Sequence, residues 1–198
     1  MSKINVISLN CDGLRSHNKK QNLCTEIKRL KPQIFMLIDT RFNEEHERIF
    51  KNLLPEYRIF SSLVTESARG VSILLSKNID IEVLDSESDD IGNLLILKVK
   101  YESKYLVLCA HYGLSDRDRP EIIENLFTKL LSLGTQNILV GGDWNLTLNF
   151  NIDNQGYNEP GKPRSARRLK ELMGIHLFKD VYSSMWNGLW GVMIWENK

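Results

Sequence analysis

The chain has little of the material from which disulfide scaffolds, membrane spans or generally basic nucleic-acid-binding proteins are built. Only three of its 198 residues are cysteine, and Cys11, Cys24 and Cys109 form no CxxC pair, so neither a disulfide framework nor a zinc site is indicated. No stretch approaches the roughly 18 consecutive apolar residues of a membrane span, and the N-terminus lacks the apolar segment of a secretory signal. The net charge is only +1, so any site for a polyanion must be local.

What remains is an ordinary globular composition. The chain is 42% hydrophobic and 26% charged, which is typical of a folded domain with a sizeable core. It contains no internal repeat, no low-complexity segment and no linker long enough to divide it. We therefore expect a single, soluble, intracellular domain over residues 1–198.

Apolar runs and turn residues predict the order of the elements. Strands are expected at residues 4–9 and 34–38, with an amphipathic helix at 19–30 between them. A short helix ending near Leu54 precedes an antiparallel series of strands at residues 57–60, 71–75, 79–84, 94–99 and 105–110. Pro120 begins another helix, Gly134 stops it, and a buried strand follows at 137–140. The apolar face expected for this last helix comprises Ile122, Ile123, Leu126, Phe127, Leu130 and Leu131.

This order predicts an α+β fold, a four-layer sandwich of two mainly antiparallel β-sheets flanked by helices. Polar side chains gather where the predicted strands end: Asn10 with Asp12, Asp39, Tyr112, and Asp143 with Asn145. Carboxylate and amide oxygens are the donors that Mg²⁺ or Mn²⁺ takes, with water and substrate phosphate completing the shell. The alternative is that these residues merely form turns, which Asn, Asp and Gly favour.

Four segments in this order resemble the endonuclease/exonuclease/phosphatase superfamily. They are SLNCDGLRS at residues 8–16, FMLIDT at 35–40, CAHYG at 109–113 and GGDWNLTLN at 141–149. The DGLR portion is similar to abasic-site endonucleases. GGDWNLTLN, followed by Asp153 and by RSARRL at 164–169, is more similar to the endonuclease domains of non-LTR (LINE-type) retrotransposons.

The resemblance implies a role for each of these positions. Asn10 and Asp39 would belong to a metal site with Asp12 as a neighbour, and Tyr112 would hold the scissile phosphate. Asp143 would orient or activate the attacking water, and Asn145 would bond the phosphate oxygens. Fixed donors and a metal suit this reaction because a phosphodiester repels its nucleophile until the developing charge is neutralised. We also expect Asp143 and Asn145 to face the same way, as residues two apart in an extended segment do.

Two departures from the family pattern affect the expected activity. The family usually carries glutamate where this chain has Asp39, which withdraws the carboxylate by roughly the length of one methylene, on the order of 1 Å, and could place water between it and a metal. After Trp195 only Glu196, Asn197 and Lys198 remain, whereas family members end with further aspartate and histidine motifs. We therefore expect a C-terminally truncated domain with absent or very weak nicking activity and an uncovered strand edge that promotes self-association.

A basic segment precedes Gly174 and offers a local site for phosphates. Arg164, Arg167 and Arg168, together with Arg15 after the first motif, are the candidate nucleic-acid contacts; a solvated helix face is the alternative. Trp186, Trp190 and Trp195 could stack on bases, although core packing fits their apolar neighbours better. The histidines, His176 included, are expected to be ordinary surface or packing residues.

Three functions remain open. The leading interpretation is a Mg²⁺-dependent (or Mn²⁺-dependent) phosphodiesterase acting on DNA, most similar to the target-nicking endonuclease of a retroelement and therefore nuclear if the chain belongs to one. The second is a catalytically impaired, nucleic-acid-binding remnant of such a domain. The third is a phosphatase of small phosphorylated substrates on the same scaffold.

Overall fold

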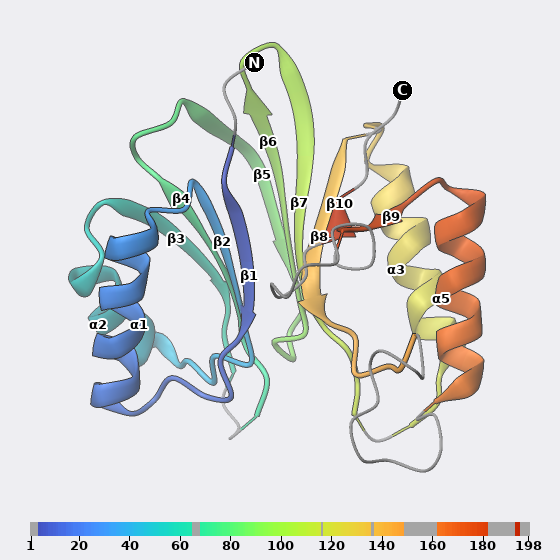
Figure 1. Cartoon of the computed structure of the whole chain (residues 1–198), viewed down its shortest axis with the longest axis horizontal. Coiled ribbons are helices and arrows are strands. Elements are labelled where there is room, and N and C mark those ends of the chain that lie inside the picture. The colour runs from blue at the N-terminus through green and yellow to red at the C-terminus, as the bar shows by residue number, and fades with distance from the viewer. Residues whose placement is uncertain are drawn as a thin grey trace.

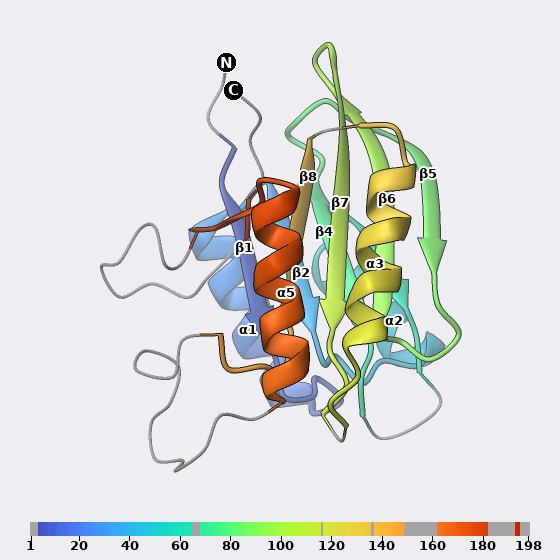
Figure 2. The ribbon, with the colours of Figure 1, turned by 90° about the vertical axis from the view of Figure 1, so that its right-hand side faces the viewer.

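The computed structural model describes residues 4–64, 68–115, 117–135, 137–148, 162–181 and 193–194. Within these residues the strands form two sheets that face each other, and helices cover the outer face of each sheet (Figure 1). This is the expected four-layer α+β sandwich. The view at right angles shows α3 (Pro120–Ser132) and α5 (Pro163–Ile175) lying side by side over one sheet (Figure 2).

The first sheet has the strand order β1-β2-β4-β3 and is built from the N-terminal part of the chain. β1 (Val6–Asn10) and β2 (Ile34–Ile38) are parallel, whereas β4 (Val71–Ser76) is antiparallel to both β2 and β3 (Tyr57–Ser62). The parallel pair is joined by the helix α1 (His17–Leu30), which packs with α2 (Glu44–Leu53) on the outer face. Every residue of β2 is buried, as expected for a strand covered on both faces.

The second sheet has the order β5-β6-β7-β8-β10-β9 in the described residues. β5 (Ile81–Ser88), β6 (Leu94–Tyr101) and β7 (Lys104–Tyr112) form an antiparallel meander, and β8 (Ile138–Asp143) is parallel to β7. The crossover between β7 and β8 is α3 (Pro120–Ser132). α5 (Pro163–Ile175) packs beside α3, and the short strands β9 (Lys179–Asp180) and β10 (Met193–Ile194) complete the sheet.

The two sheets approach most closely where β8 carries a glycine. A Cβ atom at Gly141 would lie 2.4 Å from the Sδ atom of Met36 in β2 and 3.0 Å from the hydroxyl of Ser8 in β1. No side chain fits there, so Gly141 allows β8 to lie against the opposite sheet. The apolar interior between the sheets includes Met36, Ile73, Leu97 and Leu108, all of them buried.

Several boundaries and faces differ from the sequence expectation. β5 begins at Ile81 and extends to Ser88, because a register shift between Val83 and Asp85 lets its polar second half continue pairing with β6. Leu131 is 40% exposed, because it lies beyond the face of α3 that contacts the sheet. Ile122 is only half-buried. The remaining four members of the expected face, Ile123, Leu126, Phe127 and Leu130, are buried.

The expected unpaired edge at the C-terminal strand is corrected by the sheet topology. β10 lies between two strands: Met193 and Ile194 pair with Val140 and Leu139 of β8 on one side and with Asp180 and Lys179 of β9 on the other. Self-association is not tested by this arrangement and stays a prediction.

Trp186, Trp190 and Trp195 lie outside the described residues. No helix of the described residues is long and apolar enough to cross a membrane.

Candidate active site

Both parallel strand pairs end at the same rim of the sandwich. The β1–β2 register pairs Asn10 with Ile38, so Asp39 follows directly, and the β7–β8 register pairs Tyr112 with Asp143. The close contact of Ser8 with Gly141 lies two residues before Asn10 on one strand and two residues before Asp143 on the other. Because side chains repeat every second residue along a strand, this contact directs Asn10 and Asp143 toward each other.

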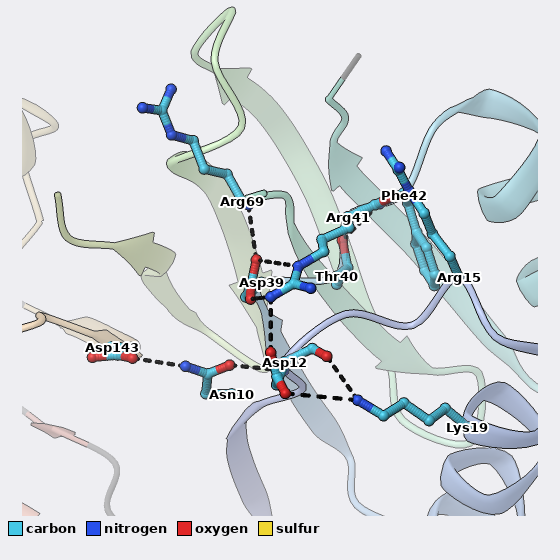
Figure 3. A network of polar contacts seen from close by, with 10 residues as sticks. All are labelled: Asn10, Asp12, Arg15, Lys19, Asp39, Thr40, Arg41, Phe42, Arg69 and Asp143. Atoms are coloured by element: carbon cyan, nitrogen blue, oxygen red, sulfur yellow. Dashed lines mark hydrogen bonds and ion pairs between the residues drawn. The ribbon is translucent and has the colours of Figure 1, made fainter. Parts of the chain in front are cut away.

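A side-chain hydrogen bond joins the two sheets at that rim. The Asn10 amide donates to Asp143 through Nδ2, which lies 2.7 Å from Oδ2 (Figure 3). The other end of the amide accepts from the backbone N–H of Asp12, with Oδ1 at 3.0 Å. Asn10 is thereby fixed in orientation by two bonds, with its amide nitrogen directed at the carboxylate of the second sheet.

Asp39 is held by an arginine that the sequence analysis did not single out. Arg41 donates to both carboxylate oxygens of Asp39, through Nη2 at 2.7 Å and Nε at 3.2 Å, and the backbone N–H of Arg69 donates to Oδ1 at 2.8 Å. The same Nη2 atom lies 2.8 Å from Oδ1 of Asp12. The guanidinium thus stands between two carboxylates, and its hydrogen bond to Asp39 is the main reason that the pKa of Arg41 is raised.

The residues that present these side chains have unusual backbone conformations. Asp12, Asp39, Arg41 and Asn145 all have positive φ angles, between 45° and 56°. Asn and Asp adopt this left-handed region more readily than most residues, but it is uncommon for arginine. Such conformations persist only where surrounding contacts impose them, and here they turn four polar side chains at the ends of β2, β8 and the β1 loop.

Asn145 reaches the site by a turn and not by continuing the strand. Its backbone N–H donates to Oδ1 of Asp143 at 2.8 Å, and its Nδ2 donates to the carbonyl of Gly113 at 2.7 Å. The expectation that Asp143 and Asn145 face the same way as neighbours in an extended segment is therefore wrong. β8 ends at Asp143, and the turn stabilised by the aspartate side chain places Asn145 beside the end of β7.

Gly113 and Lys162 support this turn. Gly113 donates its N–H to the carbonyl of Asp143 at 2.7 Å, and a Cβ atom there would lie 2.2 Å from the Trp144 carbonyl oxygen. The Lys162 ammonium bonds the carbonyl of Leu114 and, at 3.1 Å, that of Asn145. Because Lys162 directly precedes α5, this contact ties the basic helix to the site.

Tyr112 lies next to Asp143 in the sheet register and is half-buried. Its ring packs against the apolar interior between the sheets. Its neighbour His111 is buried and packs against Trp144, with ring centroids 4.8 Å apart and the ring planes tilted by 58°. Burial lowers the pKa of His111 to about 4, against the opposing influence of Asp89 and Asp143. His111 is consequently neutral at pH 7, which fits a packing role.

The basic residues predicted to contact nucleic acid differ in their exposure and in the protein groups that they bond. Arg164 and Arg167 are exposed on α5 and line a groove against α3 with a volume of about 540 Å³. The guanidinium of Arg168 bonds Glu124 of α3 at 2.6 Å and Glu171 at 3.1 Å, so it joins the two helices. Its contact with nucleic acid stays a prediction. Arg15 donates from Nε to the backbone carbonyl of Arg41 at 2.7 Å, next to the carboxylate pair.

The donor set at the rim suits a hard cation but is small. In the described part of the chain no three His, Cys, Asp or Glu side chains come together in a metal-binding group. Asp39, whose side chain is 6% exposed, and the exposed Asp12 offer carboxylates, and Asn10 offers an amide oxygen. Mg²⁺ needs few protein ligands of this kind because waters and phosphates complete its shell. The chemistry of these donors therefore fits Mg²⁺, although the guanidinium of Arg41 lies between the two carboxylates in this structure.

Comparison with solved structures gives the arrangement a family context. TDP2 of D. rerio complexed with a single-strand DNA product superposes with a TM-score of 0.68 and 18% identity, over 94% of this chain and 71% of that one. The endonuclease domain of TRAS1, a telomere-specific non-LTR retrotransposon, gives a TM-score of 0.63 and 14% identity, over 90% and 73%. This chain has the endonuclease/exonuclease/phosphatase fold. TDP2 of Caenorhabditis elegans shares it, with a TM-score of 0.61, 17% identity and coverage of 96% and 61%.

Comparison with curated proteins finds a transposon protein. The chain is 25% identical over 182 residues to the transposon TX1 uncharacterized 149 kDa protein of Xenopus laevis, which covers 90% of this chain. It spans only 14% of that protein's length. No model of a known protein family matches the chain.

Sequence reasoning missed Arg41, Gly113 and Gly141 as determinants of the geometry at this rim. Arg41 lies two residues after Asp39 in the sequence, and this spacing was the available signal. It was insufficient, because pairing across two residues requires the left-handed backbone at both positions. The glycines stand within the quoted motifs, but the atoms that exclude a Cβ from them belong to distant segments.

Proposed function

We propose that this chain is a Mg²⁺-dependent phosphodiesterase that cleaves DNA, of the type used by retroelements to nick a target. The observation that carries the proposal is the 2.7 Å hydrogen bond between Asn10 and Asp143, which places an oriented carboxylate at the rim shared by both sheets. The shared fold with TDP2, solved with a single-strand DNA product, and with the TRAS1 endonuclease domain supports it, as does the similarity to a transposon protein. If the chain belongs to a retroelement, its place of action is the nucleus.

Asp143 is the proposed base for the attacking water. Asn10 occupies Oδ2 and the Asn145 N–H occupies Oδ1, so the carboxylate is fixed and directed before substrate arrives. Fixed donors that need no rearrangement contribute most when charge develops in a transition state. The bond from Asn145 to Gly113 uses one of the two amide N–H groups and fixes the direction of the other, which we assign to a phosphate oxygen. Tyr112 is the further proposed phosphate contact.

Asn10 and Asp39 would hold the metal, with Asp12 as a neighbour. Bound there, the ion would polarise the phosphate and stabilise the departing oxygen. The protein groups would orient the substrate around it. Arg164, Arg167 and Arg15 are assigned to flanking DNA phosphates, because α5 begins at the same end of the molecule as the ends of β1 and β8 (Figure 1).

Nicking of supercoiled plasmid in Mg²⁺ tests the proposal. The wild-type chain should convert plasmid to the open circle at a low rate, and Asp143→Asn should lower that rate further, by about 10²-fold or more, as loss of a general base does. Asp90→Asn is the matched control, because Asp90 is exposed and lies in the loop before β6. Equal rates for Asp143→Asn and wild type, or cleavage that persists in a chelator, would contradict the proposal.

A second candidate function is DNA binding without cleavage. The observation that favours it is the neutralisation of Asp39 by Arg41, which withdraws a carboxylate from the metal. A gel-shift measurement beside the nicking assay separates the two functions. DNA binding without any nicking, in wild type and in Asp143→Asn alike, would support the binding function.

A further inference from the structure

The guanidinium of Arg41 occupies the position between two carboxylates that a cation would need. It lies 2.7 Å from Oδ2 of Asp39 and 2.8 Å from Oδ1 of Asp12, with the second bond to Asp39 made by Nε (Figure 3). A buried carboxylate without a partner is strongly unfavourable, and the side chain of Asp39 is only 6% exposed. Arg41 therefore supplies the positive charge that Asp39 requires.

The backbone at Gly13 provides a surface on which this guanidinium packs. A Cβ atom at Gly13 would lie 3.0 Å from Cδ, 3.1 Å from Nη1 and 3.2 Å from Cζ of Arg41, so the arginine packs directly on the glycine backbone. Gly13 has a φ of 77°, which glycine adopts without strain. Arg15 holds the same arginine from the other direction through its bond to the Arg41 carbonyl.

We infer that Arg41 is an internal counterion that competes with a divalent cation for the carboxylate of Asp39. Both oxygens of Asp39 are used by Arg41, and a dication beside a guanidinium would be repelled at these distances. Binding of the cation thus requires the guanidinium to leave Asp39. The inference rests on the proposed metal-dependent function, and it deepens that function by identifying what opposes metal binding in the free protein.

Calorimetric titration of Mn²⁺ into the full chain, without DNA, tests the competition. Arg41→Gln should bind Mn²⁺ about tenfold more tightly than wild type, within the usual range of coupling between two ligands. Adding Asp39→Asn to that variant should abolish the gain. Lys19→Gln is the charge-matched control, because Lys19 lies 3.9 Å from Oδ2 of Asp12 and bonds its backbone carbonyl. It should change the affinity by less than about threefold, as a screened, exposed charge would.

Nuclear magnetic resonance of the arginine side chains tests the inference in the wild-type chain, so it does not depend on the folding of a variant. In ¹⁵N-labelled wild type the Arg41 Nε–H should be protected from exchange, and Mg²⁺ should abolish that protection while leaving Arg29, whose Nε donates to Glu26, unchanged. Unaltered protection at saturating Mg²⁺ would overturn the inference. So would equal or weaker Mn²⁺ binding by Arg41→Gln, or an equal gain in Lys19→Gln.

These results are distinguishable from failure of the proposed function. Tighter Mn²⁺ binding by Arg41→Gln in a chain that never nicks DNA would support the competition and count against the phosphodiesterase. Nicking that depends on Asp143, with Mn²⁺ affinity unchanged by Arg41→Gln, would support the phosphodiesterase and overturn the competition.

Discussion

At the scale of single residues, the rim is built from polar groups whose environments differ sharply. Asp12 is largely exposed, Asp39 is almost fully buried beside Arg41, and His111 is buried against Trp144. Burial of a titratable group favours its neutral form unless an opposite charge is close. At His111 burial outweighs the nearby carboxylates and favours the neutral imidazole, so the effect of this group on stability at different pH is predictable.

His111 should make the fold less stable as the pH falls. Its pKa is lowered from 6.5 to about 4 in the folded chain, so the unfolded chain binds more protons between these values, and stability is lost as the pH drops from about 6.5 toward 4. The loss attributable to this group is at most about 3 kcal/mol. Urea unfolding of wild type and His111→Gln between pH 7 and pH 4 measures it. The variant should show a shallower decline, and parallel profiles would contradict the assignment.

At the scale of elements, close approach and capping by distant segments position the site. β8 lies against β1 and β2 because Gly141 has no side chain. The N-terminus of α5 has no side-chain cap from its own N-cap residue, and the loop before α3 supplies one. Asp118, which precedes α3, accepts from the N–H groups of Arg164 and Ser165 and from the Ser165 hydroxyl. Each contact joins parts of the chain that are far apart in sequence.

Gly141→Ala should destabilise the fold by about 1–3 kcal/mol, because the added methyl group overpacks the interface between the sheets. The nearest atom, 2.4 Å from the new Cβ, is the thioether of Met36, and the Ser8 hydroxyl is 3.0 Å away. Gly174→Ala, in α5 with open space around the position, is the control and should stabilise by about 0.5–1 kcal/mol. Denaturant midpoints at pH 7 compare the two, and equal effects would refute the packing argument.

Asp118→Ala should cost about 1 kcal/mol at neutral pH through loss of the cap on α5. Burial opposes ionisation of Asp118, but the bonds from Ser165 and Arg164 outweigh it and lower the pKa of this carboxyl from 3.8. The stabilisation is therefore fully present above about pH 4 and disappears as the pH falls through the folded pKa. Thermal melts of the variant and of Asp90→Ala at pH 7 and pH 3 should show the difference narrowing only for Asp118→Ala.

At the scale of the whole molecule, one rim carries both the carboxylate site and the start of the basic helix. Lys162 connects them physically, since it precedes α5 and bonds the carbonyl of Asn145. Because the net charge is +1, the proposed attraction to DNA would have to come from this local concentration of arginine and lysine. The dependence of DNA affinity on salt therefore reports which side chains contact phosphates.

The double variant Arg164→Gln/Arg167→Gln should bind duplex DNA more weakly and with a flatter salt dependence. Each lost phosphate contact lowers the slope of log affinity against log salt by about 0.9, so the expected change is about 1.8. Fluorescence anisotropy at salt concentrations from about 50 to about 200 mM, which bracket the physiological value, gives the slope. Arg29→Gln, in the last turn of α1 on the opposite outer layer, is the control. An unchanged slope in the double variant would remove α5 from the DNA-binding surface.

The order of strands and helices, the α+β class and the strand-end positions of Asn10, Asp39 and Asp143 were determined by the sequence alone. Hydrophobic period and turn residues are local signals, and the motifs follow them along the chain. The family resemblance went further than these local patterns, because it implied that residues distant in the sequence belong to one site.

Tertiary structure alone decided how these positions interact. The bidentate pairing of Arg41 with Asp39, the turn that moves Asn145 beside Gly113, and the engagement of Arg168 by two glutamates each depend on left-handed backbone or on packing of separate elements. A sequence states which charges are present, but the partner of each charge is set by the distances that folding creates. For Asp39 that partner is an arginine two residues away, and only the folded backbone turns it back onto the carboxylate.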